Sequence, residues 1–151
     1  MKILFVCSQN TCRSPMAQAI ATQLYAKSVK AEDKPEFEFD SAGIDTFGAS
    51  DIAANAKKAI YGLYGIMFAH RPQTLTKELI DKSDLVIAIS QRHLLYIKQK
   101  FGAGLENESK LTVMPEDIPD PFGMSEEAYL MCAQEIERGI KTLFGKLGIL
   151  K

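Results

Sequence analysis

The chain lacks the features that mark several large classes of protein. Its 151 residues include only three cysteines, too few for a disulfide-stapled scaffold. No apolar run approaches the ~18–20 residues that a membrane-spanning helix needs. Lys and Arg total 18 against 19 for Asp and Glu, so there is no basic excess for binding nucleic acid or an anionic membrane. We therefore expect a cytoplasmic protein without nucleic-acid or membrane partners.

The chain also lacks a signal-peptide pattern and any zinc-binding pattern. The apolar N-terminal segment 1–6 is too short for a signal-peptide core, and no small-residue cleavage site follows it. Cysteine and histidine are nowhere spaced as zinc ligands, so we expect no metal site. The remaining composition, 46% hydrophobic and 25% charged, is typical of an ordinary globular protein. The length predicts one domain spanning 1–151.

Short β-forming segments alternate with helical ones along the chain. Apolar or alternating runs bounded by turn-forming residues predict strands at 2–7, 37–40, 84–89 and 111–114. The segment 84–89 is apolar on both faces, which is typical of a strand buried in a parallel sheet. This alternation predicts an α/β fold with a mostly parallel sheet and helices on both of its faces.

The predicted helices lie between these strands. Ser14 is expected as the N-cap and Pro15 as the first residue of the first helix, which should run to about Val29. A short helix is expected to open at Thr76. Three more helices are expected at 51–63, 91–101 and 125–147. Surface loops are expected at 30–36 and at the proline-rich segment 115–123.

The segment Cys7-Ser8-Gln9-Asn10-Thr11-Cys12-Arg13-Ser14 contains the pattern Cys-x5-Arg-Ser between a predicted strand and a predicted helix. Ligands of open parallel sheets bind beyond the carboxyl ends of strands, where this loop lies. Its backbone N–H groups and the helix N-terminus would form a cradle for an anion. Arg13 is suited to bidentate binding of a phosphoryl group. The same positive field stabilises a thiolate, so Cys7 is a candidate nucleophile that would form a phosphocysteine.

Such chemistry also needs a proton donor for the leaving group and a base for water. A carboxyl group on an exposed loop would serve both steps. Asp120 is the preferred candidate because prolines flank it and Phe122 follows to form a pocket wall. Asp117 and Glu116 lie in the same loop and are the alternatives.

The chain resembles the low-molecular-weight protein tyrosine phosphatases over nearly its whole length. The N-terminal strand, the Cys-x5-Arg-Ser-Pro loop, the segment Asp-Ser-Ala-Gly at 40–43 and the late Asp120-Pro-Phe occur in the family's order. The resemblance implies a four-stranded parallel sheet, an N-terminal phosphate-binding loop, and no metal or organic cofactor. It implies a phosphorylated protein as substrate and inorganic phosphate as product, acted on by a monomer or weak dimer.

The resemblance also assigns roles by position. Cys7 matches the nucleophile, Arg13 the phosphate clamp and Asp120 the general acid. The matching phosphate-binding loop comprises Ser8, Gln9, Asn10, Thr11, Cys12 and Ser14.

Residues around this loop are matched in the same way. Ser14 matches a hydroxyl that donates to the thiolate, and Asn10 a residue held in the left-handed conformation. Ser41 and His70 match partners of that asparagine. Phe47 lies in a variable loop that often supplies an aromatic wall of the substrate pocket.

Two details are similar to the protein-arginine phosphatases of this family. Thr11 occupies a position where tyrosine-directed members usually carry an aliphatic residue. Phe122 is followed by Gly123, where those members often have a second aromatic residue. Both favour phosphoarginine over phosphotyrosine as substrate. Gln9 departs from the family, which usually has Gly there, and would strain the loop if the position required φ > 0.

The other cysteines and the second histidine have plainer interpretations. Cys12 is either simple packing or the partner of Cys7 in a protective disulfide formed on oxidation. Cys132 is expected in the core. His93 is expected to be solvated on its helix.

Two other functions remain as alternatives. A thiol-dependent arsenate reductase would use the same loop, but it needs further cysteines and the region 83–101 contains none. A phosphate-binding module could have lost catalysis through Gln9, although Cys7, Arg13, Ser14 and Asp120 are all present.

Overall fold

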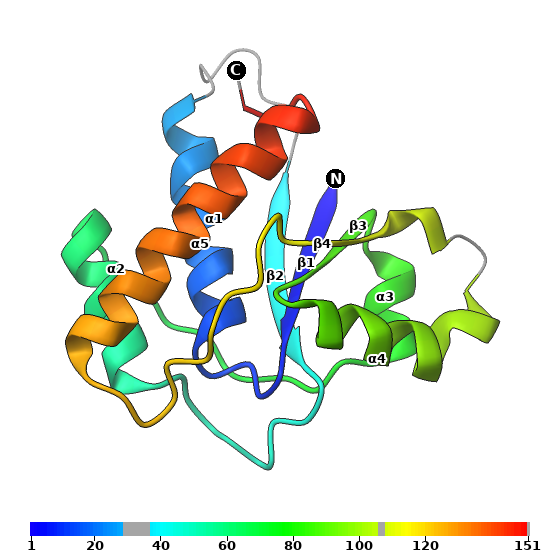
Figure 1. Ribbon diagram of the computed structural model, residues 1–151, viewed down its shortest axis with the longest axis horizontal. Helices are drawn as coiled ribbons and strands as arrows, with labels where there is room; N and C mark the ends of the chain where they lie inside the picture. The colour runs from blue at the N-terminus through cyan, green and yellow to red at the C-terminus, as the bar shows by residue number, and fades with distance from the viewer. Residues whose placement is uncertain (29–36, 106–107, 151) are drawn as a thin grey trace.

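A four-stranded parallel sheet forms the middle layer of the computed structural model, which describes residues 1–28, 37–105 and 108–150 (Figure 1). The strands are β1 (Lys2–Cys7), β2 (Glu38–Gly43), β3 (Leu85–Ala88) and β4 (Leu111–Val113). They lie in the order β2-β1-β3-β4, and each neighbouring pair is parallel. The predicted four-stranded parallel sheet is confirmed.

Helices cover both faces of this sheet. Helices α1 (Arg13–Ser28), α2 (Ala54–Tyr64) and α5 (Glu126–Lys146) pack on one face (Figure 1). Helices α3 (Lys77–Lys82) and α4 (Gln91–Phe101) lie on the other, followed by 3-10 turns at Gly102–Gly104 and Glu108–Lys110.

The side chains of β1 alternate between the two faces, as a strand of period two requires. Phe5 and Cys7 point into the core beneath α1 and α5, whereas Leu4 and Val6 point toward α3 and α4. All four are buried. Burial on both faces explains why β1 is a continuous apolar run.

Several element boundaries differ from the sequence predictions. Strand β2 continues through Ser41 to Gly43 because this segment pairs in register with residues 5–7 of β1. Helix α1 begins at Arg13, with the Cys12 carbonyl accepting from the Met16 N–H at 3.1 Å, so Ser14 lies in its first turn and is not its cap. Helix α2 begins three residues later than expected, at Ala54. The predicted end of the first helix and the loop 30–36 lie outside the described residues.

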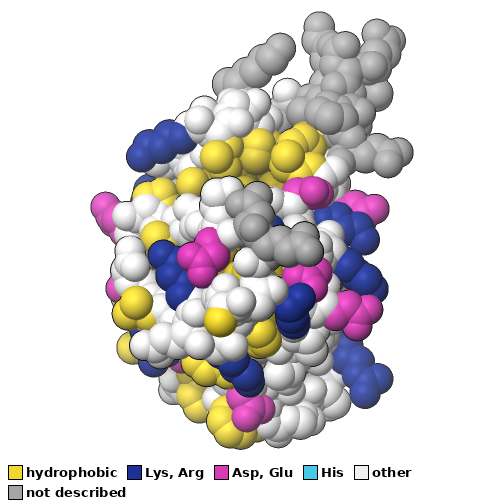
Figure 2. Space-filling view, turned by 90° about the vertical axis from the view of Figure 1, so that its right-hand side faces the viewer, with side chains coloured by type: hydrophobic (Ala, Val, Ile, Leu, Met, Phe, Trp, Pro, Cys, Tyr) yellow, Lys and Arg dark blue, Asp and Glu magenta, His cyan; other side chains and the backbone are white. Residues whose placement is uncertain are grey.

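Strands β1 and β2 end at the lower side of the sheet in Figure 1. The loops after β1 and β2 and the segment that leads to α5 all lie there. On the face that Figure 2 shows, basic and acidic side chains are interspersed, in keeping with the balanced composition. Within the part of the chain that the structure describes, no helix is both long and apolar enough to cross a membrane.

Candidate active site

The loop between β1 and α1 lies over the carboxyl end of β1. Carbonyl groups of Cys7, Ser8 and Thr11 accept from backbone N–H groups of the segment 44–53, at 2.9 to 3.0 Å. Within the described ranges, the backbone N–H groups of residues 9–12 find no acceptor in the chain. These N–H groups and the N-terminus of α1 are therefore available to a bound anion, as the predicted cradle requires.

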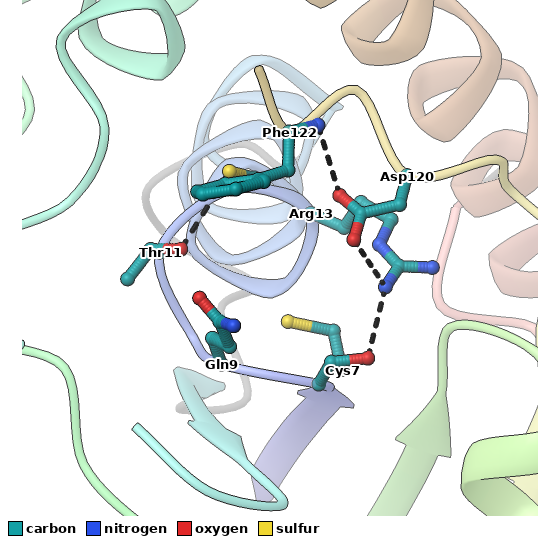
Figure 3. Close-up of a pocket in the computed structure, with 8 residues that line it drawn as sticks. Cys7, Gln9, Thr11, Arg13, Asp120 and Phe122 are labelled. Carbon is teal, nitrogen blue, oxygen red and sulfur yellow. Dashed lines mark hydrogen bonds and ion pairs between the residues drawn. The ribbon is translucent and has the colours of Figure 1, made fainter. Parts of the chain in front are cut away.

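Gly43, the last residue of β2, supports this loop. A Cβ atom there would lie 2.6 Å from the carbonyl carbon of Gln9 and 2.7 Å from the backbone N of Asn10, so only glycine fits. Gln9 itself does not have a positive φ angle, since among the described non-glycine residues only Asn10 and Phe47 do. The loop therefore accommodates the Gln9 side chain without the backbone strain that a positive φ angle would have caused. Figure 3 shows its amide at the cleft wall, between Cys7 and Thr11.

The Cys7 sulfur lies at the base of a small cleft, directly against the first turn of α1. Its Sγ is 2.9 Å from the Oγ of Ser14. The amide Nδ2 of Asn10 donates to that same Oγ at 2.8 Å. Because the Ser14 oxygen accepts from Asn10, its hydroxyl proton has two acceptors within reach: the Cys7 sulfur at 2.9 Å and the Ala42 carbonyl at 3.3 Å. The sulfur is the nearer of the two.

Asn10 is held in the orientation that this contact requires. It has a φ of 59° and is fully buried. Its Oδ1 accepts from His70 Nε2 at 2.8 Å and from the Gln73 N–H at 3.0 Å. Burial lowers the pKa of His70, which favours the neutral imidazole. Because an amide oxygen can only accept, the contact with Asn10 Oδ1 places a proton on Nε2.

Ser41 completes this support, and two of its members, Gln18 and Gln73, were missed from the sequence. The Ser41 Oγ lies 3.2 Å from His70 Nε2 and donates to Gln18 Oε1 at 2.6 Å. Gln18 follows Ser14 by four residues on α1, so the two share one helix face. That spacing was the signal that could have identified Gln18. Gln73 offers no such spacing: its backbone N–H bonds to Asn10, and its side-chain Nε2 donates to the Ser41 carbonyl at 2.9 Å, both across long stretches of sequence.

Arg13 is buried at the other side of the cleft, although its guanidinium reaches the opening. Nη1 donates to the Ile118 carbonyl at 3.1 Å, and Nη2 donates to Ser8 Oγ at 3.2 Å. Nη2 also lies 3.5 Å from Asp120 Oδ2 (Figure 3). Two segments of the chain, the loop after β1 and the loop 115–123, thus hold the fork of Arg13 facing the cradle.

Among the three acidic candidates, only Asp120 lines the cleft. Its Oδ1 accepts from the Phe122 N–H at 3.1 Å, which leaves Oδ2 directed at Arg13. Asp117 instead accepts from the Gln91 N–H at 2.9 Å, at the N-terminus of α4. Asp120 therefore has the position for proton transfer, and Asp117 stabilises a helix end.

Thr11 and Phe122 form the outer wall of the cleft. The Phe122 ring lies across the opening from Cys7 in Figure 3 and is 66% exposed. The Thr11 Oγ1 lies 3.6 Å from Cys12 Sγ. Phe47 is 76% exposed and is not among the lining residues. The cleft is lined by Cys7, Ser8, Gln9, Thr11, Cys12, Arg13, Asp120 and Phe122.

The three cysteines have different surroundings, and all are free thiols. Cys12 lies 3.2 Å from the Tyr129 hydroxyl, and burial raises the pKa of its thiol. Burial raises the pKa of Cys132 to about 12, and its Sγ faces the Pro119 carbonyl at 3.8 Å. Cys7 and Cys12 each have a hydroxyl beside the sulfur, but the one beside Cys7 belongs to Ser14, whose oxygen is held by Asn10.

His93 corrects the sequence interpretation, since the structure buries it completely. Its Nδ1 accepts from the Ser90 N–H at 3.2 Å and caps the start of α4. Its Nε2 lies 3.0 Å from Ser8 Oγ, in the phosphate loop. A lone polar residue near a helix start gave no indication of a partner 85 residues away.

The arrangement provides an anion cradle, a sulfur with a hydroxyl donor, a guanidinium and a carboxyl group around one cleft. This set is suited to nucleophilic transfer of a phosphoryl group with acid–base assistance. Across 1–28, 37–105 and 108–150, the structure contains no cluster of three or more His, Cys, Asp or Glu side chains that could hold a metal ion.

Comparison with known families decides the assignment. The family model for low molecular weight phosphotyrosine protein phosphatase matches residues 2–149. The chain belongs to this family. It is therefore a cysteine-dependent protein phosphatase, as the resemblance implied.

Individual relatives of this phosphatase extend the comparison. A protein-arginine-phosphatase from Bacillus subtilis (strain 168) is 31% identical over 151 residues, covering 97% of each chain. One from Geobacillus stearothermophilus is 35% identical over 150 residues, covering 97% of this chain and 95% of that one. A solved structure of the arginine phosphatase YwlE, a mutant with a phosphorylated active-site serine, matches with a TM-score of 0.83 and 29% identity, covering 98% of this chain and 96% of that one.

Proposed function

We propose that this phosphatase removes phosphoryl groups from arginine side chains of proteins, with Cys7 as nucleophile and Asp120 as general acid and base. The observation that carries the mechanism is the contact between Cys7 and Ser14 at the base of the cleft, with Arg13 and Asp120 at its opening. The family's phosphoenzyme chemistry, present in a structural relative with a phosphorylated active-site residue, supports it.

In the first step the Cys7 thiolate attacks phosphorus. A sulfur–phosphorus bond forms while the bond between phosphorus and the leaving nitrogen breaks. Asp120 gives its proton to that nitrogen, so the guanidino group leaves protonated. Arg13 and the loop N–H groups stabilise the charge on the equatorial oxygens. Ser14 donates to the sulfur until the attack neutralises it.

In the second step water attacks the phosphocysteine. Asp120, now a carboxylate, takes a proton from the water as an oxygen–phosphorus bond forms. The sulfur–phosphorus bond breaks, and inorganic phosphate and the Cys7 thiolate result. One carboxyl group thus serves both steps, and neither step calls for a metal or organic cofactor.

Two features support phosphoarginine as the substrate class. The two protein-arginine-phosphatases above are more than 30% identical to this chain over nearly its whole length. Thr11 and Gln9 place polar groups on the cleft wall, where the N–H groups of a guanidino substrate need acceptors. A phenyl ring has no such donors. Phe122 supplies an apolar wall that either substrate can contact.

The test is kcat/KM for phosphoarginine and phosphotyrosine peptides of one sequence, with Cys7→Ala as the blank. We expect a preference for phosphoarginine. Thr11→Val keeps the shape of the side chain and removes its hydroxyl, so it should reduce this preference. A preference for phosphotyrosine in the native protein would reject the substrate class and leave the mechanism intact. Turnover of neither substrate, with phosphate still bound, would support the binding module instead.

The proposed setting follows from this substrate class. We propose that the substrate is a phosphorylated cytoplasmic protein and that inorganic phosphate is released. The exposed ring of Phe122 at the cleft opening would contact the substrate protein beside its phosphorylated side chain.

A further inference from the structure

Three donor groups converge on the hydroxyl of Ser8, which lines the cleft next to Cys7. Arg92 Nη2 donates to Ser8 Oγ at 2.9 Å, and His93 Nε2 lies 3.0 Å from the same atom. Arg13 Nη2 donates to it at 3.2 Å. Two of these groups come from α4, which contributes nothing else to the mechanism proposed above.

The position of the proton on His93 follows from its second contact. Nδ1 accepts from the backbone N–H of Ser90, and a backbone amide can only donate. Burial, and next the cations Arg13 and Arg92, lower the pKa of His93 to about 4, so the ring is neutral near pH 7. A neutral ring whose Nδ1 accepts must carry its proton on Nε2. His93 therefore donates to Ser8 and cannot accept from it.

Counting hydrogen-bonding sites then leaves the Ser8 proton without an acceptor among the described residues. A hydroxyl has two acceptor sites and one proton to donate. Arg92, His93 and Arg13 are all donors, so none can take that proton. When Arg13 turns to bind a phosphoryl group, Arg92 and His93 fill the two acceptor sites of Ser8. The Ser8 proton is then left facing the cleft.

We propose that the Ser8 hydroxyl donates a hydrogen bond to an oxygen of the bound phosphoryl group, and that Arg92 and His93 are positioning residues that hold it as a donor. The acceptor is the phosphoryl group itself, which phosphoarginine, phosphotyrosine and inorganic phosphate share. The inference therefore goes beyond the proposed substrate class, and it stands or falls independently of it.

The first test uses inorganic phosphate as a competitive inhibitor and measures its inhibition constant. Ser8→Ala should weaken phosphate binding by about tenfold or more, the usual effect of losing a hydrogen bond to a charged group. Ser8→Thr keeps the hydroxyl and should retain most of the native affinity for phosphate. Unchanged phosphate binding in Ser8→Ala, or equal loss in Ser8→Thr, would overturn the proposal.

A double-mutant cycle separates positioning by Arg92 from direct binding of phosphate. Arg92→Ala should weaken phosphate binding in the native background and have little further effect when Ser8 is already Ala. Arg138→Ala, which removes an exposed arginine from α5, is the control for loss of charge and should leave binding unchanged. Equal effects of Arg92→Ala in both backgrounds would show that Arg92 acts without Ser8 and would overturn its positioning role.

The tautomer of His93 gives a readout that a purely structural role would not predict. Nitrogen-15 NMR of the imidazole ring at pH 7, assigned by comparison with His93→Gln, should show a neutral ring protonated at Nε2. A ring protonated at Nδ1 would offer Nε2 as an acceptor for the Ser8 proton. That result would remove the basis of the inference.

Discussion

The Sγ of Cys7 lies 2.9 Å from the Oγ of Ser14, and this contact connects the reacting sulfur to a chain of buried groups. Asn10 donates to Ser14 and accepts from His70, so the serine proton is directed at the Cys7 sulfur or at the more distant Ala42 carbonyl, 3.3 Å away. The network holds the donor in place before substrate arrives, which is the condition for electrostatic stabilisation without reorganisation.

Removing this donor should make Cys7 less reactive. We expect Ser14→Ala to slow alkylation of Cys7 by iodoacetamide at pH 6 by about tenfold or more, because a hydrogen bond to the thiolate is lost. Mass spectrometry of the Cys7 peptide measures the rate. Thr22→Ala is the matched control, since its hydroxyl bonds to the Gln18 carbonyl on the exposed side of α1. Equal rates in native protein and Ser14→Ala would contradict the assigned role.

The two aspartates of the segment before α5 should differ sharply. Asp120→Asn should lower kcat by about 10²-fold or more, because the proton donor is lost. Asp117→Asn should lower stability slightly and leave kcat near the native value, since that carboxylate accepts from the N–H at the start of α4. Steady-state kinetics and thermal unfolding of both variants make the comparison. A large loss of kcat in Asp117→Asn, with kcat unchanged in Asp120→Asn, would make Asp117 the general acid instead.

His93 should make the protein less stable as the solution becomes acidic. The unfolded chain takes up a proton on this histidine near pH 6.5, whereas burial, Arg13 and Arg92 delay uptake in the folded protein to about pH 4. Protonation therefore favours the unfolded state between these values. The free energy of unfolding should fall there by about 1.4 kcal/mol for each pH unit.

Urea unfolding at pH 7, 6 and 5 measures this slope. In His93→Gln the free energy of unfolding should depend less on pH than in the native protein, because the histidine that titrates is gone. The neighbouring Asp117 and Asp120 are present in both proteins, so their contribution cancels in the comparison. Parallel curves for the two proteins would show that His93 titrates normally in the folded state.

Gln9 should be compatible with a working phosphate loop. Its φ angle is not positive, so Gln9→Gly relieves no strain and instead increases the freedom of the unfolded chain. We expect the variant to lose about 0.5–1 kcal/mol of stability and to retain phosphate inhibition. Urea unfolding and the inhibition constant check both expectations. A gain in stability would show that Gln9 strains the loop.

Local patterns predicted the sheet, and they predicted helix α4 to the residue, because strand burial and helix boundaries leave clear signals in nearby sequence. The predicted end of β2 was wrong for a physical reason. Ser41-Ala42-Gly43 resembles a turn by composition, but pairing with β1 keeps it extended. The motif from Cys7 to Ser14 identified the cleft in advance. Gln18, Arg92 and His93 depend on contacts between distant elements, and spacing alone could indicate only Gln18.

In the proposed mechanism the phosphoryl group is transferred to Cys7, so trapping the phosphocysteine intermediate is the decisive test. The Asp120→Asn variant is mixed with a phosphorylated peptide, quenched at neutral pH, and examined by intact-mass and peptide-level mass spectrometry. We expect one added phosphoryl group, located on Cys7 and absent from a Cys7→Ala, Asp120→Asn double variant. A phosphoryl group on another residue, or turnover of the peptide by Cys7→Ala, would contradict it.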